Sequence, residues 1–164
     1  GYVPLGGVIA CEKIAKYFDD HKMMCGLTYS AHPIGCAAAV ATLNEYKNLN
    51  IAENVAKQGK VLGELLEDLH AKHACVGEVR YIGLFSAFEL VKDKATREPI
   101  VSFNEDPQGL MNKIVGMLKK EGFYTYSHEN MIIVAPPLII TEDELREAMG
   151  ILDRVMDSVD NMIK

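Results

Sequence analysis

The segment at residues 26–33 holds the side chains best suited to bind an anionic ligand. It carries two hydroxyls and a phenol ahead of Pro33, a residue that fits the first turn of a helix. The free N–H groups and the dipole at a helix N-terminus favour a phosphate, and Thr28 would add a hydroxyl donor. The other interpretation is that Thr28 and Ser30 only cap this helix. The residues alone leave both interpretations open.

Two further segments could contact a ligand. Residues 124–130 form a polar stretch between two apolar runs, and Tyr126 and His128 supply a phenol and an imidazole there. A solvated hairpin loop explains this stretch more simply. Glycines near the chain start, at positions 6 and 7, would let the backbone approach a ligand closely, although an ordinary turn is the simpler explanation there too.

The elements expected around the first segment are helical. Residues 1–10 are predicted to form a turn and a short buried strand, followed by a helix over 11–18 and a loop over 19–32. A helix rich in small residues begins at Pro33. Asn50 and Glu53 have the spacing of a capping box for the next helix, whose apolar residues keep helical periodicity up to Leu69.

The second half changes to a mixed pattern. Residues 79–91 are β-branched and aromatic, which predicts one long or bent strand with a bulge at Gly83. Asp106 begins a helix that ends before Gly122, and two short strands follow at 123–126 and 131–135, with a turn at 127–130. Thr141 and Glu144 form a capping box for a final helix with an apolar stripe.

Composition excludes several classes of function. Seventeen basic and twenty-three acidic residues give a net charge of −6, which argues against nucleic-acid binding. Charged residues interrupt every apolar run, so no transmembrane helix is expected, and no signal peptide is visible. The four cysteines and five histidines match no zinc spacing. We therefore expect no metal site and reduced thiols in a cytoplasmic protein.

Four stretches in order resemble a known family. They are GYVPLGGVI at residues 1–9, GLTYSAHPIGCAAA at 26–39, RYIGLFSAFELVKDK at 80–94 and IIVAPPLIITEDEL at 132–145. Together they resemble the C-terminal part of class III, fold type I aminotransferases, which depend on pyridoxal phosphate (PLP). The resemblance is greatest to ω-amino-acid:pyruvate and taurine:pyruvate aminotransferases, which implies transfer of an amino group from an amine or ω-amino acid to a keto acid such as pyruvate.

The resemblance implies a fold and a set of roles. The fold class is α/β to α+β, with residues 1–70 as the end of the large PLP-binding domain and interdomain helix, and 71–164 as the small C-terminal α+β domain. Thr28 matches the threonine that binds the cofactor phosphate of the neighbouring subunit in a homodimer. The family's Schiff-base lysine precedes the position of Gly1, so we expect no catalytic residue in this chain, an excised segment, and no activity from it alone.

Departures from the family pattern matter as well. Ala31 stands where the family has glycine. The stretch at 124–130 lacks the arginine with which many relatives bind a substrate carboxylate, which leaves Tyr126 and His128 as the candidate substrate contacts. Within the enzyme class, a racemase or aminomutase is a further possibility. The competing hypothesis outside that class is a stand-alone, non-enzymatic α+β ligand-binding or regulatory module.

Overall fold

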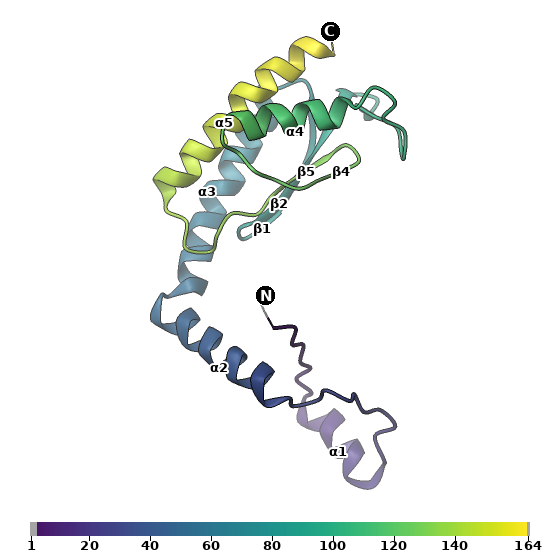
Figure 1. The fold of residues 1–164 in the computed structure, drawn as a ribbon, viewed down its shortest axis with the longest axis vertical. Helices are drawn as coiled ribbons and strands as arrows, with labels where there is room; N and C mark the ends of the chain where they lie inside the picture. The colour runs from purple at the N-terminus through teal and green to yellow at the C-terminus, as the bar shows by residue number, and fades with distance from the viewer. Residues whose placement is uncertain (1–2, 164) are drawn as a thin grey trace. The chain divides into compact units, whose positions relative to one another are not determined.

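The computed structural model describes residues 3–163, which form two compact units, Gly1–Leu49 and Asn50–Lys164. The first unit contains helices α1 (Glu12–Asp20) and α2 (Pro33–Asn48) (Figure 1). The start of α2 at Pro33 agrees with the sequence prediction. Gly35 is the one buried residue among those described in this unit. A unit with so little buried surface has no hydrophobic core of its own.

The strand predicted near the chain start is absent from the described residues. Val8 and Ile9 are almost fully exposed, at 96% and 102%, and residues 4–10 have no regular structure. A strand is stabilised by hydrogen bonds to a neighbouring strand, and the described part of the first unit offers none. The prediction of a buried strand is therefore wrong for this structure.

The second unit contains an antiparallel sheet in the order β1-β2-β5-β4, with β3 paired to β2. The strands are β1 (Val76–Ile82), β2 (Phe85–Asp93), β3 (Glu98–Pro99), β4 (Ser127–His128) and β5 (Met131–Val134). The single strand predicted over 79–91 is instead a hairpin, because Gly83 has a φ of +55° and opens a two-residue turn. The strand predicted at 123–126 is also wrong in its bounds, because the structure has the strand directly after this range, as β4.

Helices α3 (Ile51–Lys72), α4 (Leu110–Lys120) and α5 (Glu142–Met162) complete the second unit. The capping box of α5 is confirmed: the Thr141 hydroxyl accepts from the Glu144 N–H at 3.4 Å, and the Glu144 carboxylate accepts from the Thr141 N–H at 2.9 Å. The box predicted at Asn50 is wrong. Asn50 has a φ of +49° and makes no capping bond, because it follows the end of α2, where a left-handed residue is common.

Helix α4 begins three residues after Pro107, where a first turn was expected. The Asp106 carboxylate nevertheless supplies the predicted cap, since it accepts from the N–H groups of Leu110 at 2.7 Å and Met111 at 3.0 Å. Gly109, with a φ of +61°, provides the turn between them. The capping chemistry was therefore predicted correctly and the helix boundary was not.

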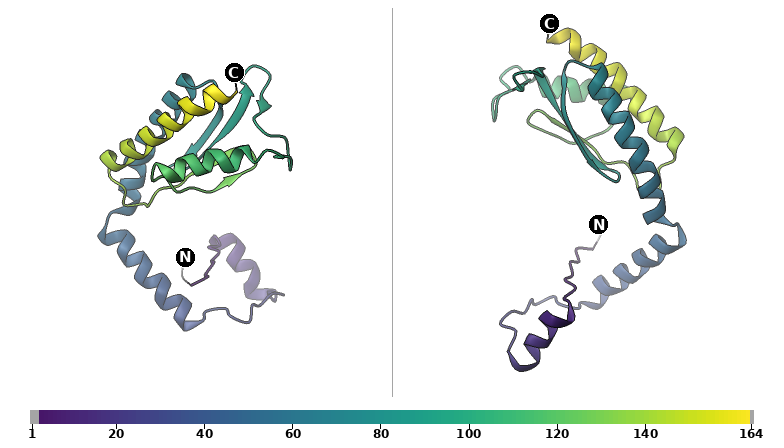
Figure 2. Two further views of the ribbon diagram at one scale, coloured as in Figure 1. Left: turned by 45° about the horizontal axis from the view of Figure 1, so that its top comes forward. Right: turned by 180° about the vertical axis from the view of Figure 1, so that it is seen from behind.

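One face of the sheet forms the core. Phe88, Leu90 and Ile132 are fully buried on it, and α4 and α5 lie side by side against this face, as Figure 2 shows. Helix α3 packs against both β1 and α5. The other face of the sheet carries half-buried side chains such as Ala87 and Ile133. Helix α3 thus belongs to the second unit by packing, while the functional division at residues 70 and 71 stays a prediction.

Two contacts fix the first half of α3. A Cβ at Gly59 would lie 2.7 Å from the Gly83 Cα, so the helix backbone approaches the β1–β2 turn closely. One turn before, the Asn54 side-chain amide donates to the carbonyls of Leu138 at 2.8 Å and Ile140 at 3.2 Å. These contacts tie α3 to the hairpin and to the segment that precedes α5.

Candidate functional site

The segment around Thr28 is a tight turn in the first unit. The N–H of Ser30 donates to the Leu27 carbonyl at 3.0 Å, and the N–H of His32 donates to the Tyr29 carbonyl at 3.2 Å. Residue 31 has a φ of +55°, a conformation that glycine adopts at little cost and that an alanine methyl disfavours. This explains in physical terms why a glycine fits the position where Ala31 stands.

This turn leads directly into the N-terminus of α2. His32 is the N-cap residue and makes no side-chain capping bond. Among the described residues, the hydroxyls of Thr28 and Ser30 have no hydrogen-bond partner either. The interpretation that these hydroxyls cap α2 is therefore not borne out. What remains is an exposed hydroxyl beside a helix N-terminus whose first N–H groups lack side-chain acceptors, a set of donors that suits an anion.

Tyr126 and His128 lie in the second unit, at the β4–β5 hairpin. The Tyr126 carbonyl accepts from the Ile133 N–H at 3.0 Å, and its side chain is 64% exposed. His128 pairs with Met131 across the ladder. Residues two apart in an extended segment share a face, so the structure brings these two side chains to one side of one hairpin. It places Thr28 in the other unit.

His128 also borders a hollow of about 390 Å³ that runs to the segment before α4. Carboxylates dominate its charged lining, from Glu105, Asp106 and Glu129. The Asp106 carboxylate is already engaged as the cap of α4. A negatively charged rim of this kind is compatible with an amine and unfavourable for a carboxylate.

A charged cluster around a buried histidine, missed at the level of sequence, joins the end of α3 to α5. The fully buried His73 places Nε2 at 2.9 Å from Asp153 Oδ1 and Nδ1 at 2.8 Å from Asp160 Oδ2. Each ring nitrogen therefore lies within hydrogen-bonding distance of one carboxylate. Lys72 adds an ion pair to Asp153 at 2.6 Å, and the Cys75 N–H donates to Asp160 at 2.7 Å.

The carboxylates of this cluster are held in their ionised form. Burial alone would raise the pKa of Asp153, but hydrogen bonds from Lys72 and His73 outweigh it and lower that pKa. Burial likewise opposes ionisation of Asp160, and bonds from Cys75 and His73 lower its pKa. Burial raises the pKa of the Cys75 thiol, which makes it inert. The cluster therefore serves packing of the second unit.

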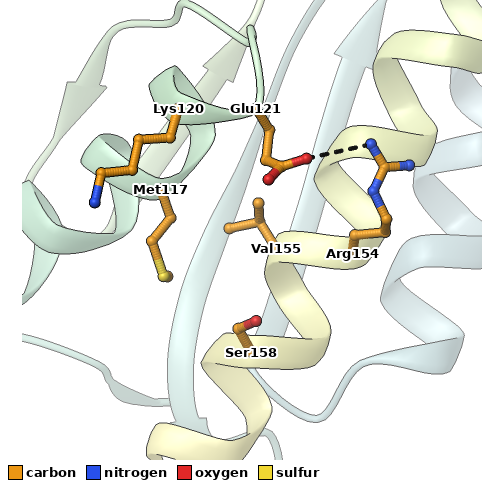
Figure 3. Close-up of a pocket in the computed structure, with 6 residues that line it drawn as sticks. All are labelled: Met117, Lys120, Glu121, Arg154, Val155 and Ser158. Carbon is orange, nitrogen blue, oxygen red and sulfur yellow. Dashed lines mark ion pairs between the residues drawn. The ribbon is translucent and has the colours of Figure 1, made fainter.

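A further hollow, of about 350 Å³, lies between α4 and α5 (Figure 3). Met117 and Val155 form its apolar part, Arg154 pairs with Glu121 at 3.6 Å, and Lys120 forms no ion pair within residues 3–163. Within residues 3–163, no group of His, Cys, Asp or Glu side chains could hold a metal ion. No helix of this described range has the length and apolar character needed to cross a membrane.

Comparison with known proteins identifies the family. A family model described as Aminotransferase class-III matches residues 1–156 of the 164. The chain belongs to the class III aminotransferase family. A taurine–pyruvate aminotransferase of Bilophila wadsworthia is 32% identical to this aminotransferase chain over 178 residues, covering 98% of it and 37% of the relative. An ethanolamine-phosphate phospho-lyase homolog of Caenorhabditis elegans is 33% identical over 132 residues, covering 79% of the chain and 27% of the relative.

Solved structures confirm the predicted fold class. The taurine:2-oxoglutarate aminotransferase of Bifidobacterium kashiwanohense, determined with PLP and glutamate, is 43% identical with a TM-score of 0.87, covering 99% of this chain and 36% of that one. A PLP-bound amine transaminase from an uncultivated Pseudomonas species is 35% identical with a TM-score of 0.78, covering 90% and 33%. The class III chain therefore has the fold of type I PLP transaminases and spans about a third of the length of these proteins.

Proposed function

We propose that this chain is part of a PLP-dependent aminotransferase that moves an amino group from an amine or ω-amino acid to a keto acid such as pyruvate. The observation that carries the proposal is the family match over residues 1–156. Relatives named for taurine–pyruvate and putrescine–pyruvate transfer, at 32% and 31% identity, support the substrate class. A match of this extent favours the enzyme over a stand-alone binding module.

The turn before α2 is the part of this chain that fits the cofactor. Thr28 would donate its hydroxyl to the phosphate of PLP, and the N–H groups at the start of α2 would add their dipoles. When bound, PLP supplies an electron sink for the carbanion that forms at the substrate carbon. The residues of this turn only orient the phosphate and hold no proton in the reaction.

Tyr126 and His128 are proposed to contact the substrate. The phenol of Tyr126 and the imidazole of His128 are exposed on one face of the hairpin and are free to donate or accept. The acidic rim beside His128 disfavours a substrate carboxylate and attracts an ammonium group. This polarity agrees with an amine or ω-amino acid whose amino end approaches the hairpin.

The remaining parts of the proposal concern the intact enzyme. We place its proton-transferring lysine outside residues 1–164, by resemblance to the family. The chain alone is then inactive, and incubation with PLP followed by borohydride reduction leaves no single stoichiometrically modified lysine. A cytoplasmic homodimer, in which Thr28 reaches the cofactor of the neighbouring subunit, completes the proposal.

Substitution of Thr28 in the full-length enzyme tests the cofactor assignment. A hydrogen bond to a charged acceptor contributes about 1.5–3 kcal/mol, so Thr28→Ala should weaken PLP binding about tenfold to a hundredfold. Thr28→Ser keeps the hydroxyl and should bind PLP almost as wild type does. Thr42→Ala is the matched control, because the Thr42 hydroxyl bonds only within α2, to the Ala38 carbonyl at 2.9 Å.

The readout is PLP titration into the apo enzyme, with a thermal melt of each variant. The maximal rate at saturating PLP should change little for Thr28→Ala, because the phosphate takes no part in bond making. Unchanged PLP affinity together with a lower apo melting temperature would show that Thr28 acts as a helix cap after all. Turnover of taurine or β-alanine only with an added keto acid separates transamination from a lyase reaction.

A further inference from the structure

A hollow of about 490 Å³ lies in the second unit, beside the β1–β2 edge of the sheet. Helix α3 contributes Glu67 and His70, the strands contribute Glu78 and Glu89, and the β2–β3 turn contributes two cations. These cations are Lys94 and Arg97. None of the functions proposed above uses this hollow.

The two cations differ from the others in the described part of the chain. Lys94 is the one described lysine that is not exposed. Arg80, Arg146 and Arg154 each form an ion pair, whereas Arg97 has none with any residue in the range 3–163. A half-buried ammonium and an unpaired guanidinium therefore line one hollow without a carboxylate bound to either.

The Lys94 ammonium is only partly satisfied. It donates to the His70 carbonyl, which leaves two of its three N–H groups free. Burial lowers the pKa of Lys94, and the opposing influence of Cys75 and Asp160 does not compensate. A desolvated cation without a bonded anion is unfavourable, so an anion entering the hollow would stabilise it.

The lining of the hollow also contains three carboxylates, from Glu67, Glu78 and Glu89. Glu78 and Glu89 share the single positive charge of Arg80, at 3.1 Å and 2.7 Å. Among residues 3–163, Glu67 has only the Tyr81 hydroxyl as partner, at 3.4 Å, and no cation. Glu67 and His70 lie one turn apart on α3, and the helix rise puts about 4.5 Å along the axis between them. The lining of the hollow thus combines two cations that have no carboxylate bound, Lys94 and Arg97, with a carboxylate that has no cation bound, Glu67.

We propose that this hollow binds a small zwitterion of the amino-acid class. Its carboxylate would accept from Lys94 and Arg97, and its ammonium group would donate to Glu67. The carboxylates of the lining would repel a dianion such as phosphate, and the cations would repel a simple amine. The proposal rests on the charges of this hollow and is independent of the proposed transamination.

The test uses the 164-residue chain and amide chemical shifts. β-Alanine is the zwitterionic probe, with propionate and ethylamine as probes that carry only one of its two charges, all at constant ionic strength. We expect saturable shifts of the Gly77, Val79 and Lys94 amides with β-alanine. Each single-charge probe should bind at least about fivefold more weakly, because it lacks one charge-assisted contact.

Substitutions at Arg97 and Glu67 test the cationic contact and the carboxylate contact of the hollow separately. Arg97→Gln and Glu67→Gln should each weaken β-alanine binding about fivefold to tenfold, and both side chains are exposed enough to be replaced without disturbing the core. Lys92→Gln is the matched control, because Lys92 pairs with Glu98 at 2.8 Å outside the hollow. Equal affinity for β-alanine and propionate, unsaturable shifts, or no effect of Arg97→Gln would each overturn the proposal. Because the readout is binding, loss of the transamination assignment would leave it unaffected.

Discussion

Alanine at position 59 should destabilise the second unit even though it improves the helix. In the interior of an exposed helix, Gly→Ala stabilises by about 1 kcal/mol. At Gly59 the new Cβ would lie 2.7, 2.8 and 2.9 Å from the Cα, carbonyl carbon and carbonyl oxygen of Gly83. These are backbone atoms of a tight turn, so they cannot rotate away as a side chain would.

The magnitude follows from the required displacement. Carbon atoms in contact prefer about 3.5–4.0 Å, so α3 and the hairpin tip must separate by roughly an ångström. Overpacking of this kind costs about 1–3 kcal/mol, and the rigid neighbour places Gly59 at the upper end. After subtraction of the helix gain of about 1 kcal/mol, the net loss is about 2 kcal/mol.

The matched control is Gly116→Ala in the middle of α4, where an added Cβ meets no atom within 4 Å. That substitution should stabilise by about 1 kcal/mol, so the two variants should move in opposite directions. Urea denaturation followed by far-ultraviolet circular dichroism measures both. A Gly59→Ala chain as stable as Gly116→Ala would refute the close approach of α3 to the β1–β2 turn.

Three further predictions concern the interior of the second unit. His73→Ala should cost about 1.5–3 kcal/mol in urea denaturation at pH 7, because Asp153 and Asp160 each lose one hydrogen bond to a charged group, while Asp153 keeps Lys72 and Asp160 keeps the Cys75 N–H. The pKa values of Asp153 and Asp160 are lowered in the folded chain, so their contribution to stability is present above the ordinary aspartate value of about 3.9 and is lost as pH falls. The urea concentration at the unfolding midpoint should therefore decline as the pH is lowered from 6 to 3. For Asp153→Asn this decline should be less steep. Gln58→Met should stabilise by about 1 kcal/mol in thermal or urea melts, because the Gln58 Oε1 is buried without a hydrogen-bond partner among the described residues.

The sequence predicted correctly the features that depend on local chemistry. The capping box of Thr141 and Glu144 and the helix start at Pro33 each follow from residues a few positions apart. Asn50 had the same local signal, yet it took a left-handed conformation because a helix ends just before it. A capping pattern between two adjacent helices is thus ambiguous, since either helix can determine the backbone there.

Features that depend on distant neighbours were less accessible. Residues 3–10 have strand-like residue types, but a strand also needs a partner strand that local pattern does not reveal. Of the candidate site, Thr28 could be named from its place before Pro33, and its function stays a prediction. The His73 cluster was missed because its partners lie 80 and 87 residues away. The available signal was the acidic i, i+4, i+7 row of Asp153, Asp157 and Asp160 on the amphipathic helix α5.

The large sequence separation between the partners in the His73 cluster has a kinetic consequence. The hydrogen bonds that join Asp160 to His73 and to Cys75 connect residues 87 and 85 positions apart in the sequence. The β1–β2 hairpin, α4 and β5 all lie within these intervals. Contacts of large sequence separation carry a loop-closure cost and form late. Substitutions at His73 should therefore accelerate unfolding while leaving the refolding rate almost unchanged. The cluster would then set the lifetime of the folded second unit and leave its rate of formation to the β1–β2 hairpin and its neighbours.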